Sequence, residues 1–186
     1  PRPAAVEGEE TRGGEGGALV GGGGKPGKSV GLVHEKLDGS ASLSNVDAES
    51  YLADLGAEIR RSSGHEGRIN VTHDVTRGLT LDAETATSLG LITTELVSNA
   101  FKHAFPAGRV GSVRVALHKG AAGALSFTVS DDGVGLPEAT DVRSSPTLGL
   151  QLVTALMRQH DATIDVERQN GTTIRITIPL KDAPTP

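Results

Sequence analysis

Residues 95–106, ELVSNAFKHAFP, close a long helical pattern that has two chemically different sides. The polar residues recur at i, i+4, i+7 and i+8 and therefore project from one side of a helix; they are Glu95, Asn99, Lys102 and His103. The apolar residues suit packing on a sheet; they are Leu89, Ile92, Leu96, Ala100 and Ala104. An acid, an amide and two potentially cationic groups above a buried face suit a bound metal ion and phosphate. The stretch predicts one wall of a site.

The composition limits the function. The chain has 186 residues, 36% of them hydrophobic, and 25 glycines, which fits one domain with an appendage. Aromatic residues are scarce and the net charge is -5, so nucleic acid is not an expected partner. The absence of cysteine excludes disulfides, thiolate metal sites and a cysteine nucleophile. We expect no membrane segment, because no apolar run approaches the roughly 20 residues that span a bilayer.

The first 28 residues are dominated by Gly, Pro, Glu and Arg without hydrophobic periodicity, which predicts a flexible tail. At the end of this tail, GGGKPGKS (Gly22 to Ser29) satisfies the P-loop pattern, in which Lys28 would contact phosphate and Ser29 magnesium. A P-loop requires a buried strand immediately before it, and the preceding TRGGEGGALV does not form one. We interpret the match as a chance product of the glycine content.

Hydrophobic periodicity predicts the elements that precede the opening stretch: a short helical piece at 29–37, a helix over about 47–61 and a strand over 69–75. Asn45 or Asp47 can cap the first turn of the 47–61 helix, and Asp82 is expected to cap the helix that ends in ELVSNAFKHAFP. His73 lies on the apolar face of the strand, where we expect a buried, hydrogen-bonded histidine with no catalytic role.

The elements after the opening stretch are expected to be two hairpins separated by a helix: strands at 113–117 and 125–129, a helix from Leu148 to about His160, and strands at 164–166 and 174–178 with Asn170-Gly171 as the turn. The whole order is helix, strand, long helix, hairpin, loop, helix, hairpin. It predicts a two-layer α/β sandwich, with helices on one face of a mixed, mostly antiparallel sheet.

A second candidate wall is SDDGVGLP (130–137), at the end of the second strand of the first hairpin. Asp131 emerges from a buried strand end, where its carboxylate could accept a hydrogen bond from an exocyclic amine. Gly133 and Gly135 permit close approach of the backbone to a ligand. A DDG turn alone has mainly a structural interpretation, and its pairing with the Glu95 helix favours a site.

Four motifs in order, ELVSNAFKHAF, SDDGVGLP, TLGLQLV and NGTTIRI, resemble the ATP-binding domain of two-component sensor histidine kinases, which belongs to the GHKL superfamily with the Bergerat fold. They match the N box, the successive G boxes and the closing Gly-Thr, and look most like the subgroup whose acceptor box begins His-Arg-x-x-Asn-Asn. The resemblance divides the chain into a tail (1–28), a remnant of a dimerisation helix with its linker (29–44), an ATPase domain (45–181) and a frayed end (182–186).

The resemblance implies roles for the polar side of the helix. Asn99 would coordinate Mg²⁺ through its side-chain oxygen, a hard ligand suited to that ion. Lys102 and His103 would face the phosphates of ATP and offset charge as the terminal phosphoryl group moves. Glu95 would orient the incoming nucleophile or a water molecule.

The resemblance also implies an adenine end of the site. Asp131 would accept a hydrogen bond from the adenine amino group, with Thr172 of the closing Gly-Thr nearby. Residues from about Leu136 to Thr147 would form a lid over the nucleotide, and the amides at the start of the next helix would favour phosphate. The other expected cofactor-binding residues are Gly133, Gly135, Leu148 and Gly149.

The chain departs from the resemblance at the acceptor. None of the six histidines (34, 65, 73, 103, 118 and 160) stands in a His-Arg-x-x-Asn-Asn context. LVHEKL (32–37) resembles a late part of the second hairpin helix, and no long amphipathic helix surrounds His34 as an alternative acceptor. The chain begins at Pro1 without a methionine, so we expect the catalytic part of a kinase whose acceptor is truncated, missing or supplied in trans.

The leading hypothesis is therefore a cytoplasmic catalytic domain of a sensor histidine kinase. It would bind Mg-ATP and transfer the γ-phosphoryl group to a histidine, from which the group passes to the receiver domain of a response regulator. One alternative is a serine kinase of the anti-sigma type, or an ATPase, of the same superfamily. A second alternative is a non-catalytic, nucleotide-binding interaction module. The stimulus, the cognate regulator and the oligomeric state are not encoded in these motifs.

Overall fold

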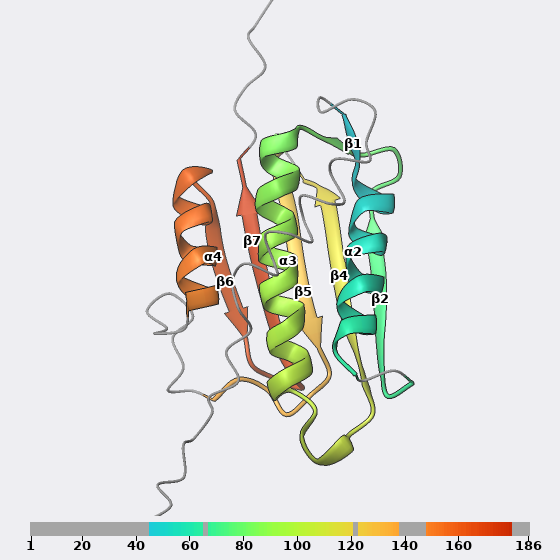
Figure 1. Cartoon of the computed structure of the whole chain (residues 1–186). Coiled ribbons are helices and arrows are strands. Elements are labelled where there is room, and N and C mark those ends of the chain that lie inside the picture. Colours follow the sequence, from blue (N-terminus) through green and yellow to red (C-terminus); the bar gives the residue numbers. More distant parts are fainter. Residues whose placement is uncertain (1–44, 65–66, 121–122, 138–147, 180–186) are drawn as a thin grey trace, which may run out of the picture.

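The computed structural model describes residues 45–64, 67–120, 123–137 and 148–179 (Figure 1). The predicted tail, the P-loop-like match, the helical piece at 29–37, most of the predicted lid and the frayed end lie outside the described residues. Among the described helices, none combines the length and the apolar character needed to cross a bilayer.

A five-stranded sheet forms one layer of the fold, with the strand order β2-β4-β5-β7-β6. β2 and β4 are parallel, and the other three neighbouring pairs are antiparallel. This confirms the mixed, mostly antiparallel sheet. The strands are β2 (Ile69–Val75), β4 (Gly111–Lys119), β5 (Leu125–Asp131), β6 (Thr163–Glu167) and β7 (Thr172–Ile178).

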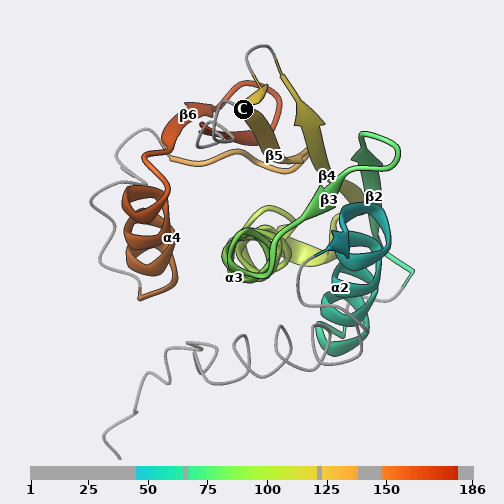
Figure 2. The ribbon, with the colours of Figure 1, turned by 90° about the horizontal axis from the view of Figure 1, so that it is seen from above.

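Within the described residues, three helices cover one face of this sheet: α2 (Ala48–Ser62), α3 (Ala83–His103) and α4 (Leu148–Gln159). Seen from above, α3 lies between α2 and α4 (Figure 2). The predicted caps are confirmed, because Asp47 accepts a hydrogen bond from the backbone N–H of Ser50 and Asp82 accepts one from that of Thr85, each at 2.8 Å.

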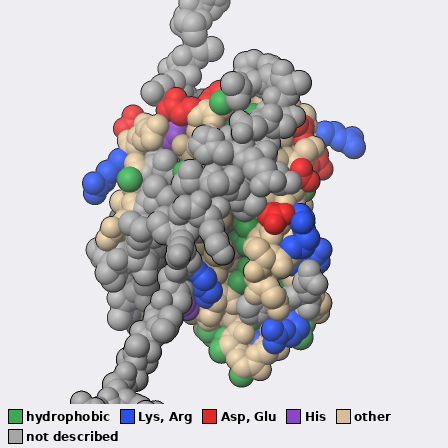
Figure 3. All heavy atoms as spheres, viewed as in Figure 1, with side chains coloured by type: hydrophobic (Ala, Val, Ile, Leu, Met, Phe, Trp, Pro, Cys, Tyr) green, Lys and Arg blue, Asp and Glu red, His purple; other side chains and the backbone are tan. Residues whose placement is uncertain are grey.

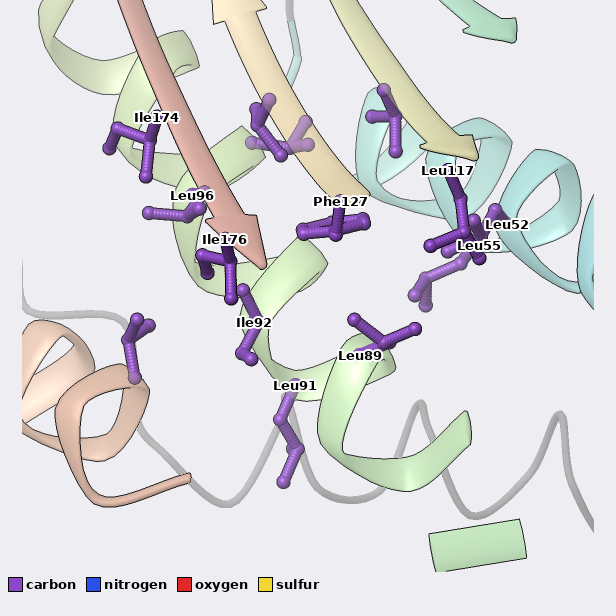
Figure 4. Packing of buried hydrophobic residues seen from close by; sticks show 14 of the residues in the cluster. Leu52, Leu55, Leu89, Leu91, Ile92, Leu96, Leu117, Phe127, Ile174 and Ile176 are labelled. Atoms are coloured by element: carbon purple, nitrogen blue, oxygen red, sulfur yellow. The ribbon is translucent and has the colours of Figure 1, made fainter. Parts of the chain in front are cut away.

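The core lies between the helices and the sheet and is largely aliphatic. Leu89, Ile92 and Leu96 of α3 are buried in it, together with Phe127 of β5 and Ile176 of β7, which are completely buried (Figure 4). The apolar side of α3 is thus buried as its periodicity predicts. Shortening one buried leucine to alanine in such a core costs about 2–5 kcal/mol.

Two local features were not predicted. β1 (Val46–Asp47) and β3 (Thr80–Leu81) form a short antiparallel ribbon beside the starts of α2 and α3. His73 is only partly buried, and its Nε2 atom has no hydrogen-bond partner among the described residues. Gly56 of α2 packs against the ring so closely that a Cβ on Gly56 would overlap that nitrogen. The expected hydrogen-bonded histidine is thus found only in part: the ring is half-buried and bonds to the Leu52 backbone, while Nε2 has no partner among the described residues.

A tight reversal connects α3 to β4. The short 3-10 turn η1 (Pro106–Gly108) follows α3, and Ala107 and Gly108 both have positive φ angles, 54° and 78°. The N–H of Arg109 donates to the carbonyl oxygen of Pro106 at 3.1 Å, which closes the turn. The reversal brings the first residues of β4 beside the end of α3.

Candidate nucleotide-binding site

Three chain segments meet at one end of the sheet. β5 ends at Asp131, β7 begins at Thr172, and these two residues are cross-strand partners. The loop after β5 reaches the end of α3, where the N–H of Val134 donates to the carbonyl oxygen of Ala104 at 2.9 Å. In Figure 1 this is the lower end of the molecule. The SDDGVGLP segment and the end of the ELVSNAFKHAF helix are therefore in direct contact, as two walls of one site require.

Asp131 lies where these segments meet. Its Oδ1 accepts hydrogen bonds from the N–H of Gly133 at 2.9 Å and from the N–H of Thr172 at 3.3 Å. Burial raises the pKa of the Asp131 carboxyl, the bonds from Gly133 and Thr172 oppose this rise, and the nearby charge of Asp132 adds to it. Both backbone bonds end on Oδ1, and the Thr172 side chain also hydrogen-bonds this carboxylate.

Glycines permit the close approach of these segments. Gly133 packs against the end of α3, and a Cβ there would overlap the carbonyl group of Ala104. Gly171, which the sequence suggests mainly as a turn residue, has a φ of 109°, and a Cβ there would overlap the carbonyl oxygen of Asp131. Gly135 also has a positive φ, 81°. At these three glycines the backbone is therefore not covered by a side chain of its own.

Asp132 was missed by sequence reasoning. Its carboxylate accepts hydrogen bonds from the N–H and the hydroxyl of Ser112 at 2.8 and 2.9 Å. Its carbonyl oxygen accepts one from Nη2 of Arg109 at 2.8 Å. This acid therefore ties the turn to the first residues of β4. The sequence carries no signal for these bonds, because they depend on the register between β4 and β5.

The polar side of α3 lies in the last turns of the helix. Glu95 and Asn99 are partly buried, while Lys102 and His103 are exposed in the final turn, where cations complement the helix dipole. On the face shown in Figure 3, the visible Asp and Glu side chains lie over the upper half, whereas the charged side chains over the lower half are Lys and Arg. The end of α3 is accordingly suited to an anionic ligand.

The donor set at this end fits a nucleotide-bound Mg²⁺ better than a metal site made of protein ligands alone. No group of three or more His, Asp or Glu side chains that could hold a metal ion occurs within the described part of the chain. An amide oxygen such as that of Asn99 is a hard ligand, and Mg²⁺ commonly combines one or two protein oxygens with phosphate oxygens and water.

α4 is attached to α3 near its own C-terminal end. Nε2 of His160 and Oγ of Ser88 are hydrogen-bonded at 2.9 Å, and Nε2 of Gln159 donates to Oε1 of Glu84 at 2.9 Å. The predicted site residues Leu148 and Gly149 lie in the first turn of α4, at the other end of this helix. The surroundings of both residues lie outside the described part of the structure.

Comparison with known proteins identifies the fold. Residues 84–182 match the family of histidine kinase-, DNA gyrase B- and HSP90-like ATPases. The chain belongs to this family. It contains a GHKL ATP-binding domain of the histidine kinase type, as the resemblance of its four motifs implied.

Two relatives of this GHKL domain are named as histidine kinases. Sensor histidine kinase PdtaS of Mycobacterium tuberculosis is 35% identical over 162 residues, which cover 82% of this chain and 30% of that protein. Blue-light-activated histidine kinase 2 of Erythrobacter litoralis is 30% identical over 160 residues, which cover 83% of this chain and 45% of that protein. The chain thus spans less than half the length of either relative.

A solved structure agrees with the sequence relatives. The histidine kinase domain of the Erythrobacter litoralis EL346 blue-light activated histidine kinase superposes with a TM-score of 0.72 at 29% identity. The superposition covers 83% of this chain and 73% of that domain. The α/β sandwich of this GHKL domain is therefore that of a histidine kinase.

Proposed function

We propose that this chain is the catalytic part of a sensor histidine kinase, which binds Mg-ATP and transfers the γ-phosphoryl group to a histidine. The phosphoryl group would then pass to an aspartate on the receiver domain of a response regulator. One observation carries the proposal: the partly buried Asp131 carboxylate is held by Gly133 and Thr172 in a turn that contacts the end of α3.

The chain's residues would bind the base at this turn. Asp131, fixed through Oδ1, would accept a hydrogen bond from the exocyclic amino group of adenine. The glycines at 133, 135 and 171 would let the ring approach the backbone, because side chains there would occupy the space or strain the turn. Binding of the base would then direct the phosphates toward α3.

The polar side of α3 would act on the phosphates. When bound, Mg-ATP supplies the phosphoryl group and the ADP leaving group. Asn99 would hold the metal ion through its side-chain oxygen, and the charges of Lys102 and His103 would offset that of the phosphates. Glu95 would orient the incoming imidazole or a water molecule. The protein would thus contribute positioning and electrostatics and no covalent nucleophile.

The acceptor histidine would come from a dimerisation hairpin outside this chain. No histidine of the chain has the sequence context of the expected acceptor box. The matched relatives are named as histidine kinases, and this chain covers only 30% and 45% of their lengths. An acceptor hairpin in trans is therefore the substrate to test.

A transfer assay tests this function. The chain is incubated with γ-labelled ATP, Mg²⁺ and a separate acceptor hairpin, and label on the hairpin is followed. We expect acid-labile label, which is the property of phosphohistidine, and its loss in the Asn99→Ala variant. Acid-stable label would contradict transfer to histidine and would instead support the serine kinase alternative.

A second candidate is a nucleotide-binding interaction module without transferase activity. The same assay separates the two. Nucleotide binding without transfer to any acceptor hairpin would support the module, and release of free phosphate without labelled protein would support an ATPase.

A further inference from the structure

We propose that Asp132 is a positioning residue that sets the preference of this site for adenine nucleotides. It does so by fixing the turn that follows Asp131 and donates the Gly133 N–H to the Asp131 carboxylate. The proposal rests on the function proposed above, in which Asp131 accepts a hydrogen bond from the adenine amino group. Asp132 itself would not touch the base.

The turn is held on three sides by different neighbours. Toward β7, Oδ1 of Asp131 accepts the N–H of Thr172. Toward α3, Val134 donates to the carbonyl oxygen of Ala104. Toward β4, Asp132 accepts two hydrogen bonds from Ser112. Each neighbour belongs to a different part of the fold, so together they define the position of the turn.

The bonds between Ser112 and Asp132 extend the β4–β5 ladder by one residue pair beyond Val113 and Asp131. Asp132 donates its own N–H to the carbonyl oxygen of Ser112 at 3.3 Å, and its carboxylate accepts the Ser112 N–H in return. The side chain thus takes the place of a backbone acceptor. The carbonyl oxygen of Asp132 accepts instead from Nη2 of Arg109.

Gly111 leaves the space that the Asp132 carboxylate occupies. A Cβ on Gly111 would lie 2.4 Å from Oδ1 of Asp132 and 2.2 Å from the ring of Phe105. The residue before Ser112 therefore has no side chain where Asp132 folds back onto β4. The start of β4 is shaped to accept this carboxylate in one position.

The residues after Asp132 are held by backbone bonds alone, from Gly133 to Asp131 and from Val134 to Ala104, and no side chain there fixes the turn. Gly133 and Gly135 have wide conformational freedom, and Gly135 already adopts a positive φ. Val134 is 58% exposed and does not anchor the turn in the core. Asp131 itself keeps its strand pairing with Val113 and Thr172. Without the bonds to Ser112, we expect the turn after it to shift, and with it the Gly133 N–H that orients the Asp131 carboxylate.

Such a shift would change the affinity of the site according to the group that a purine carries at position 6. An amino group there donates a hydrogen bond to a carboxylate, whereas a carbonyl oxygen there is an acceptor and is repelled. A hydrogen bond depends steeply on distance and angle. A misplaced Asp131 would therefore lose affinity for an amino purine and would reject a carbonyl purine less strongly.

The test compares ATP with inosine triphosphate, whose purine carries a carbonyl oxygen in place of the amino group. Dissociation constants of both nucleotides with Mg²⁺ are measured by calorimetry for the whole chain and its variants. In Asp132→Ala, we expect the ATP preference to fall about tenfold, the value of one hydrogen bond to a charged group. Equal losses for both nucleotides would assign Asp132 to general stability and overturn the proposal.

Two further variants separate geometry from charge. In Asp132→Asn, the amide oxygen can still accept the Ser112 N–H while its NH₂ donates to the Ser112 hydroxyl, so we expect the preference of the unmodified chain. Asp74→Ala is the matched control, because it removes an exposed acid that pairs with Arg114 on β4 and lies outside the turn. A loss of preference in Asp132→Asn equal to that in Asp132→Ala would contradict positioning by these bonds.

Circular dichroism establishes that each variant is folded at the temperature of the titration. If Asp132→Ala does not fold, Ser112→Ala is used in its place, because it removes only the hydrogen bond from the Ser112 hydroxyl to Asp132. An unchanged preference for ATP in that variant would overturn the proposal. A different result would contradict the proposed function itself: no preference of the unmodified chain for ATP, together with unchanged dissociation constants in Asp131→Asn. A preference that depends on Asp131 and not on Asp132 leaves the function intact and refutes only this inference.

Discussion

Gly171 is the residue at which the backbones around Asp131 approach most closely. We predict that Gly171→Ala lowers the free energy of unfolding by roughly 1–3 kcal/mol, because it combines a positive φ with overlap on the Asp131 carbonyl oxygen. Urea unfolding measures the loss. Gly78→Ala is the control, since Gly78 has a φ of 71° and nothing within 4 Å of an added Cβ. Equal losses in the two variants would mean that the contact with Asp131 does not matter.

His73 makes the stability of the α2–β2 contact sensitive to pH. Burial lowers the pKa of its imidazole below the ordinary value of 6.5, and the nearby Leu52 backbone only partly opposes this. As the pH falls, the unfolded chain therefore binds a proton before the folded chain does. Stability from the neutral ring is complete above about pH 6.5 and is lost as the pH falls from there through the folded-state pKa.

We predict that His73→Gln, which cannot titrate, reduces the loss of stability between about pH 7 and about pH 5. The measurement is urea unfolding of both chains at several pH values. Carboxylates such as Asp74 titrate in both chains, so only the difference between the two pH profiles reports on His73. Superimposable profiles would show that protonation of this ring is not linked to folding.

At the scale of secondary structure, the bond between His160 and Ser88 is one of two hydrogen bonds that attach the end of α4 to α3. We predict that Ser88→Ala, which leaves His160 without this partner, costs about 1 kcal/mol and speeds amide exchange in α4 about fivefold. Thr87→Ala is the matched control, because the Thr87 hydroxyl bonds to the Ala83 carbonyl oxygen of its own helix. Equal exchange in α4 for both variants would contradict the anchoring role.

Elements with a clear period could be predicted from the sequence. The apolar stripe and the Asp82 cap predicted α3, which spans Ala83–His103, and alternation predicted the strand now seen as β2. The ribbon of β1 and β3 was missed, because two-residue strands are too short to show a period. The buried Nε2 of His73 without a hydrogen-bond partner was missed, because its surroundings depend on where Gly56 of α2 packs.

At the scale of the whole molecule, sequence motifs suggested residues for the candidate site. They did not predict the hydrogen bonds and backbone contacts that hold those residues in place. Asp131 and Thr172 could be proposed together by resemblance, and their pairing between β5 and β7 places them side by side. The bonds from Ser112 to Asp132 and the overlap at Gly171 follow from strand register. Register and strand order arise from contacts between distant segments, which no local pattern encodes.

The elements that would bind the nucleotide meet at one end of the sheet. β5 ends there, β7 begins there, and α3 ends beside them with its cationic last turn. The base and the phosphates of one nucleotide would therefore be bound by different elements. We expect the two parts of the site to respond differently to Mg²⁺.

Calorimetric titration of ATP with and without Mg²⁺ tests this central claim most directly. In Asp131→Asn, which turns one acceptor oxygen into a donor, we predict at least about tenfold weaker binding in both conditions. In Asn99→Ala, we predict that only the extra affinity conferred by Mg²⁺ is lost. ATP affinity equal to that of the unmodified chain in both variants, with and without Mg²⁺, would contradict the site described here.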